Sequence, residues 1–158
     1  MKILDCTLRD GGYYTNWDFP IPLVKSMVAS LIRNGVDIIE LGYKSPKKGG
    51  PFRKCNDGFI SDLLDYTHDT DIAFMIDAKD FISGESVNYS LLDDCIKNRK
   101  SSPFSICRLA IKIDEVRQAK QIAKYLFDKG YKVFINLMCI SLLKESQIAL
   151  FVTELKDN

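Results

Sequence analysis

The sequence contains very little histidine and no paired cysteines. His68 is the only histidine of the 158 residues, and the five cysteines are scattered without a CxxC or other close pair. Zinc ribbons and disulfide frameworks need such clusters, so the thiols are predicted to be reduced and mostly core residues. His68 lies before the third expected strand, at the amino-terminal face of a parallel sheet, which makes it a poor candidate for catalysis.

Long apolar runs and an excess of one charge are also absent. No run reaches the roughly 18 residues needed to cross a bilayer, and Asp5 interrupts the start of the chain before a signal peptide can form. The 22 basic and 21 acidic residues give a net charge of +1, which offers no support for a nucleic-acid surface. We therefore expect a cytoplasmic protein that binds neither nucleic acid nor membrane.

The chain does contain a regular alternation of strand and helix patterns. Strand patterns occupy residues 3–9, 36–43, 71–77, 104–112 and 131–140. Helix patterns occupy residues 21–35, 59–66, 90–99, 114–130 and 141–158. Gly11 and Gly12 are expected to form the turn after the first strand, Gly35 and Gly130 to end helices, and Ser90 to cap one.

Five strand-helix units in succession predict an α/β fold with a parallel sheet and right-handed crossovers. The strands are nearly continuous apolar runs, as expected when both faces are buried. Two architectures fit this order. One is a doubly wound, flavodoxin-like sheet, and the other is the first part of a TIM barrel with strands in the order 1-2-3-4-5. Length favours the first, because a full barrel takes about 250 residues.

Candidate functional residues lie toward the carboxyl ends of the strands, where ligands bind in either architecture. They are Arg9, Asp10, Glu40, Tyr43, Asp77, Arg108 and Asn136. A carboxylate beside an arginine suits a divalent cation and a developing oxyanion. Glu40 is the most telling residue, since an acid within an apolar strand is costly unless it is paired. The other charges also fit ordinary solvent-facing positions, and the basic loop 44–54 fits either an anion site or a solvated loop.

Two motifs carry a family resemblance. LDCTLRDGG followed by IIELGY resembles the metal-dependent aldolase and acyl-CoA lyase superfamily of TIM barrels, the pyruvate carboxyltransferase type that includes hydroxymethylglutaryl-CoA lyase and isopropylmalate synthase. VFINLMCIS resembles the fifth strand of its 4-hydroxy-2-oxovalerate aldolase-like branch. The resemblance runs through all five units and is strongest over residues 3–43. It implies that residues 1–158 are the amino-terminal part of one aldolase-type barrel domain.

The resemblance also implies a chemistry and roles for the residues. Carbon–carbon bonds would be cleaved or formed through the enolate of a 2-oxo acid or an acyl-type substrate, with magnesium, manganese or zinc as the metal. Asp10 matches the family's first metal ligand, Arg9 the arginine that steadies the enolate oxygen, and Glu40 the acid that orients this arginine. The remaining strand-end residues are expected to bind substrate: Tyr43, Asp77, Arg108 and Asn136.

The sequence departs from the family pattern in two places. The His-x-His pair that completes the family's metal site is absent, so we expect weak metal binding and an inactive 158-residue chain that self-associates through its open strand edges. The aldolase branch places a base histidine three residues after the metal-ligand aspartate. Here that position is Tyr13, which is kept as a catalytic candidate with Arg9 and Glu40. The alternative is a non-catalytic, flavodoxin-like binding module for a small anion or partner, which strand order distinguishes.

Overall fold

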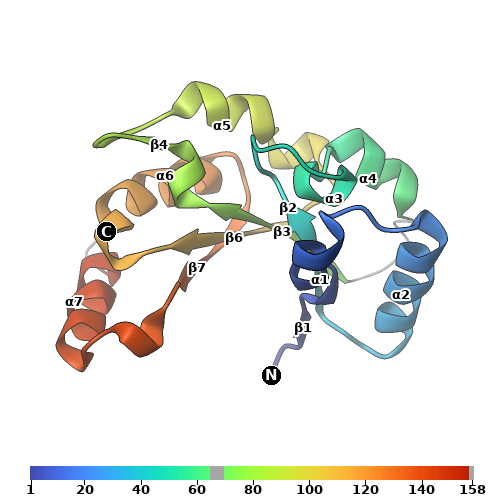
Figure 1. The fold of residues 1–158 in the computed structure, drawn as a ribbon, viewed down its shortest axis with the longest axis horizontal. Helices are drawn as coiled ribbons and strands as arrows, with labels where there is room; N and C mark the ends of the chain where they lie inside the picture. Colours follow the sequence, from blue (N-terminus) through green and yellow to red (C-terminus); the bar gives the residue numbers. More distant parts are fainter. Residues whose placement is uncertain (65–69, 157–158) are drawn as a thin grey trace.

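The computed structural model describes residues 1–64 and 70–156 and contains five parallel strands that curl into half of a barrel (Figure 1). Their order is β1-β2-β3-β6-β7, which follows the sequence without a reversal. The strands are β1 (Leu4–Asp5), β2 (Ile38–Tyr43), β3 (Asp71–Asp77), β6 (Ile106–Ile111) and β7 (Lys132–Leu137). The expected barrel order is therefore confirmed, and the doubly wound alternative is wrong, because such a sheet reverses its order beside the first strand.

Seven helices and one hairpin surround this sheet in the described part of the chain. The helices are α1 (Thr7–Thr15), α2 (Ile21–Arg33), α3 (Pro51–Lys54), α4 (Asp57–Leu63), α5 (Tyr89–Cys95), α6 (Val116–Asp128) and α7 (Glu145–Lys156). The hairpin consists of β4 (Ile82–Ser83) and β5 (Ser86–Val87). In Figure 1, α2 lies beside β1 at one end of the arc, and α7 lies beside β7 at the other. The sequence analysis did not predict α1, α3 or the hairpin.

The two faces of the sheet carry different side chains. Alternate residues such as Ile39, Phe74 and Leu109 point toward the helices and form the main apolar core. The opposite, inner face holds a small apolar cluster of Ile38, Ala73 and Ile106, with Leu4 packed against it. Glu40 and Arg108 follow on this inner face, because side chains alternate along a strand. The candidate site is thus built on the inside of the arc.

The first strand is much shorter than predicted. The Asp5 carboxylate accepts hydrogen bonds from the backbone N–H of Thr7 at 3.1 Å and from its hydroxyl at 2.9 Å. These bonds end the strand and start α1, so Arg9 and Asp10 lie on a helix. Gly12 does not form a turn either. It lies inside α1, where a Cβ would come within 2.1 Å of the Trp17 ring. The strand predicted over 3–9 is therefore present only at Leu4–Asp5, and the predicted glycine turn is wrong.

The remaining predicted elements agree closely with the structure. β3 has the predicted bounds, and α2 and α6 are followed by Gly35 and Gly130 with φ of +74° and +93°, the left-handed conformation that favours glycine. The helix predicted over 90–99 begins one residue earlier and is capped by the Asn88 side chain, so Ser90 is not its cap. His68 lies outside the described residues.

β7 differs from the other long strands. β2, β3 and β6 are buried along nearly their whole length, as predicted. In β7, burial alternates, and Phe134 is 41% exposed. The strand lies at the edge of the sheet and pairs only with β6 in the described part of the chain, so its side chains have neighbours from one strand. The prediction of two buried faces is therefore wrong for β7.

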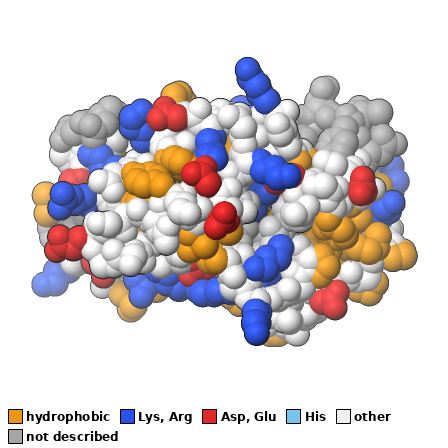
Figure 2. Space-filling model, turned by 90° about the horizontal axis from the view of Figure 1, so that it is seen from above, with side chains coloured by type: hydrophobic (Ala, Val, Ile, Leu, Met, Phe, Trp, Pro, Cys, Tyr) orange, Lys and Arg blue, Asp and Glu red, His pale blue; other side chains and the backbone are white. Residues whose placement is uncertain are grey.

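The outer surface shows no dominant charge on the face seen in Figure 2, where basic and acidic side chains are interspersed. None of the helices that the structure describes is long and apolar enough to span a membrane.

Candidate functional site

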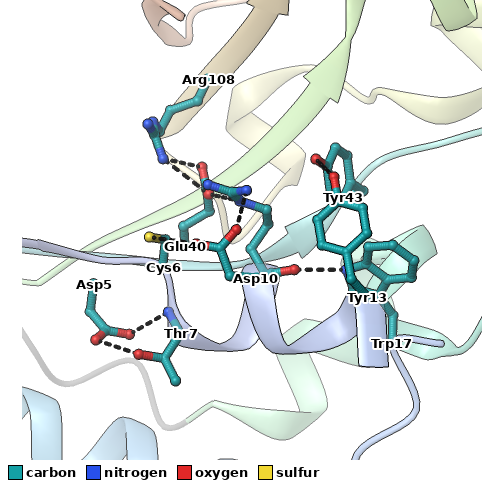
Figure 3. Close-up of polar contacts among 10 residues, drawn as sticks. Asp5, Cys6, Thr7, Asp10, Tyr13, Trp17, Glu40, Tyr43 and Arg108 are labelled. Atoms are coloured by element: carbon teal, nitrogen blue, oxygen red, sulfur yellow. Dashed lines mark hydrogen bonds and ion pairs between the residues drawn. The ribbon is translucent and has the colours of Figure 1, made fainter. Parts of the chain in front are cut away.

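Helix α1 and strands β2 and β6 bring together Arg9, Asp10, Glu40 and Arg108, here called the Glu40 cluster (Figure 3). Glu40 is fully buried. Arg9 Nε donates to Glu40 Oε1 at 2.6 Å, and Arg108 Nη1 donates to both Glu40 oxygens at 3.1 Å. The predicted pairing of Glu40 with Arg9 is present. Arg108 was expected to bind substrate, and it shares the same carboxylate.

The two guanidinium groups explain how Glu40 tolerates burial. A buried carboxylate is stable only when it is paired and hydrogen-bonded. Burial alone would lower the pKa of Arg9, but the hydrogen bond and the charge of Glu40 outweigh it and raise that pKa. Arg9 therefore stays charged. Its backbone carbonyl also accepts a hydrogen bond of 3.0 Å from the Trp17 indole, which fixes the helix beneath the guanidinium.

Asp10 occupies the solvent side of the cluster, with 56% of its side chain exposed. Its Oδ1 accepts a hydrogen bond of 2.5 Å from Arg9 Nη1, and its Oδ2 accepts one of 3.3 Å from the Cys6 thiol. Burial, followed by the hydrogen bond to Asp10, raises the pKa of Cys6. This thiol is therefore kept protonated beside the carboxylate.

The described residues do not by themselves form a metal site. Both Asp10 oxygens already accept hydrogen bonds. Within residues 1–64 and 70–156, no group of three His, Cys, Asp or Glu side chains is placed to hold a metal ion. Asp10 is thus a single potential ligand.

Three aromatic side chains flank the Glu40 cluster. The hydroxyl groups of Tyr13 and Tyr43 lie 2.8 Å apart. Both rings meet the Trp17 ring edge-on, with centroid distances of 4.7 and 5.7 Å. Burial, followed by the hydrogen bond with Tyr13, raises the pKa of Tyr43, so Tyr43 holds its proton firmly. Arg9 and Tyr13 are four residues apart on α1, which places them on one side of the helix.

Asp77 and Asn136 lie farther along the same face of the sheet. Both are in register with Ala110, two residues beyond Arg108. Asp77 accepts a hydrogen bond from the Lys79 backbone N–H and pairs with its ammonium group at 2.8 Å. No hydrogen bond or ion pair in the described part of the chain joins Asp77 or Asn136 to the Glu40 cluster. They lie beyond the cluster, toward the carboxyl ends of the strands.

The sequence analysis missed Cys6 and Trp17 as parts of the site. Both depend on α1 being a helix, because Cys6 reaches Asp10 and Trp17 reaches Arg9 only through its winding. The signal available was the spacing of four residues between Cys6 and Asp10 and again between Arg9 and Tyr13. The basic loop was also misjudged, since Lys44 is buried and pairs with Asp57 at 2.7 Å.

Comparisons with known proteins establish the fold. No protein-family model matches the sequence, and no curated protein matches it. A solved structure described as the "N-terminal domain of a putative aldolase from Bacteroides vulgatus" matches with a TM-score of 0.72 and 24% sequence identity. The match covers 99% of this chain and 60% of the length of the solved chain. The chain therefore has the α/β half-barrel fold of that aldolase-like domain.

Proposed function

We propose that this chain carries the first part of the active site of an aldolase or lyase that acts through the enolate of a 2-oxo acid. The observation that supports this proposal is the Arg9 guanidinium, held by the buried Glu40 on the inner face of a half-barrel. A preorganised cation at this position stabilises negative charge that develops on an oxygen. Its Nε and Nη1 are engaged by Glu40 and Asp10, so Nη2 is left for the substrate.

The residues of the cluster have separate roles in this proposal. Arg9 binds the oxygen that becomes the enolate oxygen when the carbon–carbon bond breaks, and Glu40 fixes the plane of the guanidinium. Arg108 donates only its Nη1 to Glu40, which leaves Nε and Nη2 for a substrate carboxylate. Tyr43, Asp77 and Asn136 line the route by which substrate approaches from the carboxyl ends of the strands.

We propose that a divalent metal ion (magnesium, manganese or zinc) binds here, with Asp10 as its one proposed ligand from this chain. A bound metal would supply a Lewis acid for the 2-oxo acid. The described residues provide no complete site for it, so we expect the 158-residue chain to bind manganese weakly and Asp10→Asn to remove this binding. Calorimetry of the two proteins measures the difference. Equal affinity in the variant would show that Asp10 is not a ligand.

The test of the proposed function is exchange of the C3 protons of pyruvate with solvent. The protein tested is the longer one of which this chain is proposed to form the first part. It is incubated with pyruvate and Mg²⁺ in D₂O, and loss of the methyl proton signal is followed by NMR. We expect exchange in the unchanged protein and a loss of about a hundredfold in Arg9→Met, because one oxyanion donor contributes about this much. Arg117→Met is the matched control, since Arg117 is exposed on α6.

A second candidate function is binding of a small anion without catalysis. Two guanidinium groups on the inner face favour it, because each can donate hydrogen bonds to an anion besides those that it gives to Glu40 and Asp10. The exchange experiment separates the two functions. Binding of pyruvate without proton exchange would support the anion site and contradict the enolate chemistry.

Self-association is also proposed. Large apolar side chains are exposed on β7 and the segment after it, including Phe134, Leu142 and Leu150. The edge strand β7 also presents unpaired backbone groups, which favour pairing with another chain. Light scattering that shows a monomer at high concentration would contradict this.

A further inference from the structure

The pair of hydroxyl groups on Tyr13 and Tyr43 remains without a defined role in the proposed chemistry. Tyr13 is 62% exposed on α1, and Tyr43 is mostly covered at the end of β2. Figure 3 shows the two side chains pointing toward each other next to Trp17. An exposed tyrosine gains little stability from a hydrogen bond at the surface, so the close contact of 2.8 Å points to a shared function.

We propose that Tyr13 is the proton-transfer group for the enolate carbon and that Tyr43 is its positioning residue. The proposal rests on the proposed function and assigns the acid–base residue of that same site. Arg9 and Tyr13 are on one side of α1, so a substrate oxygen at the guanidinium places the neighbouring carbon near the Tyr13 hydroxyl. A tyrosine can transfer a proton in this way when it is held by a hydrogen bond.

The difference in burial decides which hydroxyl gives up its proton. Burial raises the pKa of Tyr43 first, and the hydrogen bond with Tyr13 raises it further. Tyr43 therefore keeps its proton and donates a hydrogen bond to the Tyr13 oxygen. This leaves the Tyr13 O–H free to point to the substrate, and it stabilises negative charge on Tyr13 after the transfer.

The charged groups that face the pair act in opposite directions. The Arg9 guanidinium lowers the pKa of Tyr43 and the Glu40 carboxylate raises it, both by less than burial does. On the far side of the aromatic group, the Arg53 guanidinium of α3 stacks on the Trp17 ring at 4.3 Å from its centroid. Arg53 thus contacts the aromatic group through Trp17, while Arg9 and Glu40 are the charged groups that act on Tyr43 itself.

The step balances in protons and electrons. When the enolate is protonated, the O–H bond of Tyr13 breaks and a C–H bond forms at C3. The electron pair of the enolate enters this C–H bond, the carbonyl is restored, and the tyrosinate recovers a proton from water at its exposed edge. In the reverse direction, the tyrosinate takes a C3 proton and the enolate forms.

The experiment is the same deuterium exchange at C3 of pyruvate. It is measured from pH 6 to pH 9 on the longer protein of which this chain is proposed to form the first part. Tyr13→Phe should reduce exchange about a hundredfold or more, and Tyr43→Phe about tenfold, because it removes one hydrogen bond. Tyr14→Phe is the matched control, since Tyr14 is the next residue of α1 and is 94% exposed. It should leave exchange unchanged.

The pH profile distinguishes a catalytic tyrosine from a structural one. A histidine base loses its proton near its ordinary pKa, so the rate that it supports levels off above about pH 7. Tyr13→His should therefore retain exchange and level off. Exchange that is lost in Arg9→Met but unaffected in Tyr13→Phe would overturn this inference and leave the proposed function intact. Absence of exchange in the unchanged protein would overturn both.

Discussion

Glu40 and Asp57 are buried carboxylates that form ion pairs in the described part of the chain, and their surroundings differ. Asp57 pairs with Lys44 at 2.7 Å and accepts a hydrogen bond of 2.5 Å from Ser102. The Lys44 ammonium lies over the rings of Phe74 and Phe104, 5.4 and 5.1 Å from their centroids. This pair is enclosed. The Glu40 cluster instead continues to solvent through Asp10.

Under the proposed function, this difference separates a structural ion pair from a functional one. The Lys44 and Asp57 side chains are 1% and 6% exposed and bind each other, so solvent reaches little of this pair. The Glu40 cluster contains two cations for one buried carboxylate, and both guanidiniums keep unused N–H groups on the inner face. A buried charge with spare hydrogen-bonding capacity is the feature that indicates a binding or catalytic site.

The largest expected effect is the loss of the enclosed pair. Lys44→Met leaves Asp57 buried without its cation, and the free energy of unfolding should fall by about 3–5 kcal/mol. Urea unfolding measures this. The control is Lys124→Met, which removes an exposed pair with Asp128 on α6 and should change stability by less than about 1 kcal/mol. Similar stabilities for the two variants would show that the enclosed pair is not structural.

The second prediction concerns the open cluster. Glu40→Gln removes the charge that fixes Arg9, so pyruvate exchange should fall about a hundredfold, the effect of misplacing a catalytic group. Stability should fall by only about 1–3 kcal/mol, because both arginine side chains are 14% exposed and can reach water. Paired exchange and urea measurements give the ratio of the two effects. A variant that is strongly destabilised but fully active would reverse the comparison.

The third prediction tests the helix that carries the open cluster. Gly12→Ala places a methyl group 2.1 Å from the Trp17 ring and should reduce stability by about 1–3 kcal/mol. Gly11→Ala is its matched control one residue away. There the new Cβ lies 3.7 Å from the Phe19 ring, an ordinary contact, and stability should rise by about 0.5–1 kcal/mol. Thermal unfolding compares them, and equal shifts would contradict the observed packing of α1.

The smallest expected effect comes from a third carboxylate, Asp71, at the opposite end of β3. Burial alone would raise the pKa of Asp71, but hydrogen bonds from Ser105 and Lys132 outweigh it and lower that pKa. A lowered pKa adds stability above the ordinary carboxyl range, which disappears as the pH falls through the native value. Asp71→Asn should therefore cost less than about 1 kcal/mol at pH 7, and this cost should disappear as the pH falls through the lowered pKa of Asp71. If the two proteins still differ in stability in acid, the effect of the substitution arises from packing and not from the charge of Asp71.

Much of this architecture was predictable from the sequence, because β2, β3 and β6 are apolar runs with helices between them. The prediction failed where side chains override the local pattern. Asp5 ends β1 after two residues through its hydrogen bonds to Thr7. Strand and helix propensities do not include such a side-chain contact. Gly12 suggests a turn, yet it serves to admit the Trp17 ring. The buried Lys44 also escaped notice, since its partner Asp57 is thirteen residues away.

The chemistry of the site was predictable only in part. Glu40 within an apolar strand requires a cation, and Arg9 is that cation. The second cation, Arg108, depends on which strand lies next to β3, and this is a property of the whole sheet. The contact of Tyr13 with Tyr43 depends on the helical winding of α1, which the sequence analysis did not predict.

The strand order has a consequence for how the protein folds during synthesis. Each strand of the half-barrel pairs only with the preceding and following strands of the same sheet, and no later strand inserts between two earlier ones. A nascent chain can therefore add one strand-helix unit at a time to an edge that already exists. Folding need not wait for a distant segment, and the strands of the Glu40 cluster, β2, β3 and β6, can assemble before β7 leaves the ribosome.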